Sequence, residues 1–176
     1  RDSSTVPTSS VRLQVVHAAP SAPAVAVFVT TPGANLAASA PVGSFAFKGV
    51  LAAATISAGD YQIRVTPAGA SSPVLYDSGT VTLAGGSDLL VVALESTGPG
   101  TSPIKLLAVP RSGAALQLLD RSTPARVRVI HASPDTPPVQ VIANNNFGAP
   151  LVASLAFPNA TPFVNVPGAT YNLKVT

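Results

Sequence analysis

The sequence contains no cysteine, and this absence excludes two kinds of site. Disulfide frameworks and thiolate-metal centres both require cysteine side chains. Only seven acidic residues are present and they are scattered singly, so a calcium-binding loop with clustered carboxylates is not expected. We therefore expect no cofactor and no bound metal ion.

Long hydrophobic runs are also missing. The longest unbroken apolar stretch is residues 89–94, whereas a membrane-spanning helix needs roughly 20 apolar residues. The chain is nevertheless 47% hydrophobic and only 10% charged, so it has ample apolar surface to bury. We predict a folded protein that does not span a membrane.

Aromatic residues make up 5% of the chain, tryptophan is absent, and the net charge is only +3. A nucleic-acid-binding surface usually clusters lysine and arginine among aromatic residues. The densest basic segment, residues 121–128, holds three arginines and no aromatic residue. Nucleic acid is therefore not an expected partner.

Helical periodicity is absent as well, because 18 prolines and 13 glycines interrupt every long window. Short segments instead alternate apolar and polar residues, as in residues 61–66, where Tyr61, Ile63 and Val65 alternate with polar side chains. We predict an all-β fold, an immunoglobulin-like antiparallel β-sandwich with essentially no helix. The predicted strands cover residues 11–17, 25–30, 44–47, 50–56, 61–66, 74–76, 79–83, 88–95, 104–109, 115–119, 126–131, 139–143, 151–157, 161–166 and 171–175.

One stretch of sequence occurs twice, at residues 11–27 and 125–141, with an offset of 114 residues. Residues 154–157 likewise match residues 44–47, and residues 171–176 match residues 61–66. The pattern predicts an extended N-terminal arm at 1–10, a first sandwich at 11–120, a linker at 121–124 and a partial second sandwich at 125–176. The matching stretch pairs His17 with His131, Pro20 with Pro134 and Pro23 with Pro137.

The second sandwich is predicted to be incomplete, because the strands that follow Thr66 have no counterpart within the sequence after Thr176. Half a sandwich exposes an apolar sheet face and open strand edges. Three completions stay open: the natural chain continues, another molecule supplies the missing strands, or the half-sandwich packs on the first domain. Self-association through open β-edges is one of these expectations.

The matching stretches are similar to the hallmark of domain-of-unknown-function family 4397, Val-Arg-Val-x-His-Ala-Ser-Pro-Asp-Ala-Pro-x-Val-Asp-Val. The second stretch, Val127-Arg-Val-Ile-His-Ala-Ser-Pro-Asp-Thr-Pro-Pro-Val-Gln-Val141, agrees closely, while the first departs at Ala19, Ser21 and Ala26. The resemblance implies a sandwich fold and a secreted bacterial protein, extracellular or in the cell envelope. It implies no activity.

His131, Ser133 and Asp135 are the residue types of an acyl-transfer triad, but a triad normally unites separate segments around an oxyanion hole. The matching positions of the first stretch are His17, Ala19 and Ser21, so the serine and aspartate are not shared. We therefore predict no catalytic residues. We expect the histidines to be partly buried and bonded to nearby backbone, and Ser133 or Asp135 to cap backbone donors.

Tyr61 and Tyr171 each follow a glycine-containing turn and open a strand, which is typical of the tyrosine corner of immunoglobulin-like domains. With no catalytic constellation, the sequence favours a non-enzymatic structural or adhesive surface protein, including a fibre subunit assembled by strand complementation between subunits. The alternative is a monomeric surface module that binds a glycan or a peptide through its loops.

Overall fold

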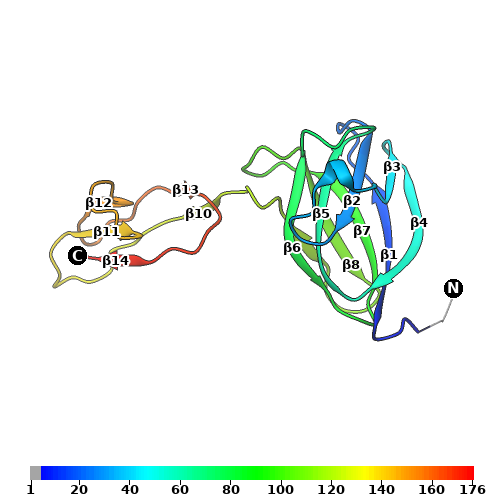
Figure 1. The fold of residues 1–176 in the computed structure, drawn as a ribbon. Helices are drawn as coiled ribbons and strands as arrows, with labels where there is room; N and C mark the ends of the chain where they lie inside the picture. The colour runs from blue at the N-terminus through cyan, green and yellow to red at the C-terminus, as the bar shows by residue number, and fades with distance from the viewer. Residues whose placement is uncertain (1–4) are drawn as a thin grey trace. The chain divides into compact units, whose positions relative to one another are not determined.

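The computed structural model describes residues 5–176, and the chain divides into two compact units between Thr123 and Pro124. Unit 1 contains nine strands and one short 3₁₀-helix, and unit 2 contains five strands (Figure 1). The unit 1 elements are β1 (Ser10–His17), β2 (Val25–Thr30), η1 (Leu36–Ala38), β3 (Gly43–Phe45), β4 (Val50–Ser57), β5 (Gly59–Pro67), β6 (Tyr76–Leu83), β7 (Asp88–Glu95), β8 (Ile104–Pro110) and β9 (Leu116–Leu118). Those of unit 2 are β10 (Ala125–Val127), β11 (Val139–Ala143), β12 (Val152–Leu155), β13 (Val164–Val166) and β14 (Leu173–Val175).

Unit 1 is a two-layer sandwich, which confirms the predicted fold class. One sheet has the order β4-β1-β7-β8-β9 and the other the order β3-β2-β5-β6. All strand pairs are antiparallel except β1 and β7, which run parallel in the register Arg12 to Asp88 through His17 to Ala93. The first strand of the chain therefore lies in the interior of its sheet, between β4 and β7.

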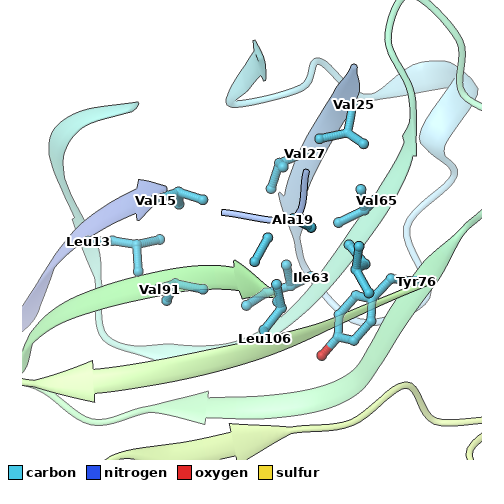
Figure 2. Close-up of a cluster of buried hydrophobic side chains, with 12 residues drawn as sticks. Leu13, Val15, Ala19, Val25, Val27, Ile63, Val65, Tyr76, Val91 and Leu106 are labelled. Carbon is cyan, nitrogen blue, oxygen red and sulfur yellow. The ribbon is translucent and has the colours of Figure 1, made fainter. Parts of the chain in front are cut away.

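The core of unit 1 forms because alternate residues of both sheets point inward. Figure 2 shows Val15 and Val91 from one sheet and Val27 and Val65 from the other directed into a common interior. Tyr76 is fully buried at this core. The burial pattern of β1, in which every second residue is buried, is the one that its sequence alternation predicts.

The segment at residues 74–83 differs from its prediction as two strands. It is a single strand, β6, which begins at Tyr76 and carries a break in register against β5 between Gln62 and Arg64. Gly79, with φ at 64°, lies opposite that break. The turn-forming residues at 77–79 therefore make a bulge within one strand and do not separate two strands.

Part of the predicted N-terminal arm lies outside the described residues. The described part packs against the connection between β6 and β7, where the N–H of Gly86 donates to the carbonyls of Pro7 and Ser10 at 3.1 and 2.8 Å. A Cβ atom on Gly85 would lie 1.6 Å from the carbonyl oxygen of Thr8. Residues near Thr8 are thus held against unit 1 and do not extend freely from it.

Unit 2 pairs its strands in the register of unit 1. Its sheets have the orders β10-β13 and β12-β11-β14, so β10 matches β1, β13 matches β4, β11 matches β2 and β14 matches β5. The register of β10 with β13 and of β11 with β14 agrees with the matched pairs residue by residue. Strands β10 and β13 are shorter than the predicted strands 126–131 and 161–166, and Ile130 forms an isolated bridge with Ala160.

Candidate functional site

Both histidines are buried, with 1% of His17 and 5% of His131 exposed. His17 is the last residue of β1, whereas His131 lies beyond the end of β10. In each case the chain turns at the following proline, Pro20 or Pro134, and returns past the ring. Because the proline-rich corner brings later main-chain groups back over the imidazole, both ring nitrogens find backbone partners.

Those partners are the same in both units. Nδ1 accepts a hydrogen bond from the N–H two residues later, Ala19 or Ser133, at 3.3 Å. Nε2 lies 3.3 Å from the carbonyl of Pro23 in unit 1 and 3.2 Å from that of Pro137 in unit 2. A neutral imidazole with its proton on Nε2 satisfies both contacts. Each histidine side chain therefore stabilises the proline-rich corner of its own unit through two contacts with the main chain.

The triad residue types at 131, 133 and 135 do not assemble into a proton relay. The Ser133 hydroxyl pairs with the Thr136 hydroxyl at 2.6 Å, whereas its main-chain N–H approaches the His131 ring. Within the described chain the Asp135 carboxylate has no hydrogen-bond partner, and it is exposed. Within the described residues no backbone N–H donates to the Ser133 hydroxyl or to the Asp135 carboxylate, so the expected capping by either side chain is not formed.

The two tyrosines make the same contact in both units. The Tyr61 hydroxyl donates to the carbonyl of Ser57 at 2.9 Å, and the Tyr171 hydroxyl donates to the carbonyl of Pro167 at 2.8 Å. Each bond spans four residues and closes the turn that precedes the strand. This is the geometry of a tyrosine corner, in which the hydroxyl bonds to upstream backbone.

Glu95, at the end of β7, also contacts the proline-rich corner that joins β1 to β2. Its Oε1 accepts a hydrogen bond from the N–H of Ser21 at 2.8 Å. Hydrogen bonds from the Ser21 hydroxyl and N–H lower the pKa of the Glu95 carboxyl, although the group is exposed to solvent. Glu95 therefore holds the proline-rich corner from outside while His17 holds it from inside.

The apolar side chains of β14 are exposed where their matched residues are buried. Ile63 and Val65 on β5 are 4% and 1% exposed and pack with Val91 and Leu106 of β7 and β8. Leu173 and Val175, the matched residues, are 57% and 65% exposed. Within the described residues, β10 and β14 each pair with one strand only, so each has an open edge. We call these two strands the open edges.

Basic side chains lie on the open edges, and two of them come from the densest basic segment of the sequence, residues 121–128. Unit 2 has three basic residues, Arg126 on β10, Arg128 just after it and Lys174 on β14, and a single acidic residue, Asp135. The guanidinium groups of Arg126 and Arg128 lie 4.9 and 5.8 Å from the centroid of one phenylalanine ring, Phe163. In the sequence, Arg126 and Arg128 alternate with apolar residues, which is typical of side chains on the exposed face of a strand.

Metal-binding and membrane-spanning features are not found in residues 5–176. No group of three or more histidine, cysteine, aspartate or glutamate side chains gathers in this part of the chain. No helix in the same residues has the length and apolar character needed to cross a membrane.

Comparison with known proteins gives a family without an assigned activity. None of the curated proteins matches the chain. A family model described as "domain of unknown function (DUF4397)" matches residues 11–120 and again residues 125–176. These matches cover most of the chain, with boundaries that coincide with the predicted first and second sandwiches. The chain therefore belongs to the DUF4397 family.

Proposed function

We propose that this chain is a non-enzymatic structural or adhesive protein of the bacterial cell surface or extracellular space. In this proposal the two units are tandem copies of one sandwich domain, and molecules join through β-strand complementation at unit 2. The secreted location in this proposal is supported by the family resemblance of the histidine-containing stretches.

The observation that carries the proposal is the open side of unit 2. Leu173 and Val175 occupy inward-facing positions whose counterparts in unit 1 are core residues, yet more than half of each side chain is exposed. Strand edges and apolar faces of this kind are templates for pairing with another chain. Strands of another molecule added along β10 and β14 would bury these side chains and pair the backbone groups of both edges.

The histidines support the non-enzymatic part of the proposal. A general base needs a free lone pair directed at its substrate, and a metal ligand needs the same. Both ring nitrogens of His17 and His131 are already engaged by main-chain groups. The apolar space between the two sheets of unit 1 is lined by aliphatic side chains and Phe45, and no titratable group lines it.

The test is the assembly state of the native, undenatured protein, measured by light scattering and negative-stain electron microscopy. We expect regular filaments or oligomers. The double variant Leu173→Ser/Val175→Ser should abolish assembly, because it removes the apolar face of β14. Val74→Ser is the matched control, since Val74 is an exposed valine in unit 1. Single-chain particles at every concentration would contradict the proposal.

A second candidate is a monomeric module that binds a glycan or a peptide. It is favoured by a shallow groove of about 360 Å³ on the outer side of β2, lined by Phe28, Leu36, Ser39, Ser44 and Ser71. Saturable binding on a glycan or peptide array, lost in Phe28→Ala and retained in the Leu173→Ser/Val175→Ser variant, would favour this function over assembly.

A further inference from the structure

An apolar groove of about 230 Å³ opens in unit 1 between the edge strands β6 and β9. One wall is the sheet that contains β5 and β6, and the other is the sheet that contains β7, β8 and β9. The groove reaches Leu13, Ile63 and Val91, three core residues that are labelled in Figure 2. It therefore leads from the surface into the interior of the sandwich.

Leu116 on β9 faces this groove and is largely exposed. Strand β9 pairs antiparallel with β8, with Leu118 opposite Leu106 and Leu116 opposite Ala108, so both leucines of β9 face the interior. Leu106 is 3% exposed, whereas Leu116 is 59% exposed. All of these residues belong to unit 1, in which both sheets of the sandwich are formed. Leu116 is thus an inward-facing apolar side chain that the rest of unit 1 leaves uncovered.

The two ends of the groove differ. At one end, the Tyr76 hydroxyl donates a hydrogen bond to the Leu118 carbonyl at 3.2 Å and joins the two sheets. At the other end, Ser87 and Pro110 line the groove and also line a second, polar hollow that contains Arg111. The groove therefore ends at a bond between the sheets on one side and continues into a polar hollow on the other.

The lining of the groove favours an aliphatic occupant. Among the described residues, no charged side chain and no aromatic ring lines it, and the hydroxyl of Thr82 already donates to the Asp60 carboxylate at 2.6 Å. A peptide would bring N–H and C=O groups that find few partners here, and an aromatic ligand would find no ring to stack on. An alkyl chain needs neither. Along β7 the groove extends from Ser87 to Val91, roughly 13 Å at the rise of a strand, which accommodates an extended chain of roughly ten carbon atoms.

The polar hollow favours an anionic head group. Arg111 is exposed there, and guanidinium groups bind carboxylates through paired hydrogen bonds. Asp88 also lines the hollow, and its Oδ2 lies 4.0 Å from the Nη1 of Arg12. An acidic ligand therefore meets one exposed guanidinium group, and the one carboxylate nearby already has a cationic neighbour.

We propose that unit 1 binds a free fatty acid of medium chain length. The alkyl chain lies between β6 and β9 against Leu116, and the carboxylate lies beside Arg111. Burial of the chain supplies most of the affinity, because the groove offers apolar contacts along its length. The site lies wholly within unit 1, so it does not depend on the proposed assembly through unit 2.

The experiment titrates the full chain with hexanoate, octanoate, decanoate and dodecanoate by isothermal titration calorimetry, below the concentrations at which these acids form micelles. We expect decanoate to bind with a Kd below about 100 μM and with a negative heat-capacity change. Affinity should rise by up to about fourfold per added methylene until the groove is filled. In methyl NMR spectra the resonances of Leu116 and Leu118 should shift on binding, and those of Leu119 should not.

Matched variants test the two parts of the site. Leu116→Ser should weaken decanoate binding about tenfold, whereas Leu119→Ser, which replaces an exposed leucine outside the groove, should leave it unchanged. Arg111→Gln should weaken decanoate binding about fivefold and leave decanol binding unchanged. Arg128→Gln, with the same change in net charge, should affect neither ligand. All four replaced side chains are exposed, so the variants are expected to fold.

Several outcomes would overturn the inference. These are no binding of any of the four acids, an affinity that does not depend on chain length, or equal losses in the Leu116 and Leu119 variants. Association with phosphatidylglycerol vesicles without binding of monomeric decanoate would also overturn it, because that result would indicate a membrane surface in place of a single free chain. Decanoate binding by a chain that never assembles would support this inference and contradict only the proposed function.

Discussion

The hydroxyl of Tyr76 donates a hydrogen bond to the main-chain carbonyl of Leu118, at 3.2 Å. Tyr76 is on β6, the edge of one sheet, and Leu118 is on β9, the edge of the other, so the bond joins the two layers where both end. Burial, aided by the nearby Asp120 and Asp77 carboxylates, raises the pKa of the Tyr76 hydroxyl far above its usual range. The group therefore stays protonated and remains a donor.

Tyr76→Phe removes this bond and keeps the ring. We expect the free energy of unfolding of unit 1 to fall by about 1 kcal/mol, because the Leu118 carbonyl loses its partner. Tyr76→Ala, which also removes the buried ring, should cost about 3–5 kcal/mol. Urea denaturation followed by circular dichroism measures both, and a phenylalanine variant as stable as the parent would show that the bond contributes nothing.

His17→Ala should lower the free energy of unfolding by about 3 kcal/mol, because it leaves the Ala19 N–H and the Pro23 carbonyl without partners at a buried site. His131→Ala should act in the same direction on unit 2, where the ring also packs edge-on against Phe157 with centroids 6.4 Å apart. Thermal unfolding of the two single variants is the measurement. If both variants unfolded at the same temperature as the parent protein, the histidine side chains would not stabilise the corners.

Gly85→Ala should displace residues near Thr8 from unit 1, because the added Cβ would overlap the Thr8 carbonyl. We expect faster proteolytic cleavage of the N-terminal residues and a loss of at least about 1 kcal/mol in stability. Gly98→Ala is the matched control, since a Cβ there meets nothing within 4 Å. Equal cleavage rates in the two variants would contradict the packing of the arm.

The contact between Glu95 and Ser21 should respond to pH. Because the pKa of Glu95 is lowered in the folded protein, the stabilisation from this contact is present above the usual glutamate pKa of about 4.3 and is lost as the pH falls through the lowered value. We expect the Ser21 amide proton resonance to hold its position until the pH drops below that range and then to shift. Glu95→Gln should abolish this titration, and a shift centred at the ordinary glutamate pKa would refute the contact.

The positions of several strands were predictable from sequence. The predicted ranges 25–30, 88–95 and 139–143 coincide with β2, β7 and β11. These segments are short, rich in apolar residues and bounded by turn-forming residues, and that combination is typical of strands. The bulge at Gly79 was not predictable in the same way, because a turn-forming residue signals either a loop or a bulge and the neighbouring strand decides between them.

Partners across the sheet were not predictable from local pattern. The parallel pairing of Arg12 with Asp88 joins residues far apart in the sequence, and nothing in either strand alone specifies the other. Which strands of unit 2 lie at sheet edges also depends on strand pairing, so the open edges became visible only with the sheets in place. In contrast, the sequence alone shows that the strands after Thr66 have no matched strands in the second repeat as given, because a comparison of the two repeats is sufficient.

The parallel pairing of β1 and β7 has a mechanical consequence for unit 1. Strand β8 runs antiparallel to β7 and β9 antiparallel to β8, so β9 points in the same direction as β1. The start of β1 and the end of β9 therefore lie at opposite ends of the sheet. Tension applied through the chain pulls β1 lengthwise against its neighbours, and the hydrogen bonds along Ser10–His17 must yield together instead of opening one at a time from an end.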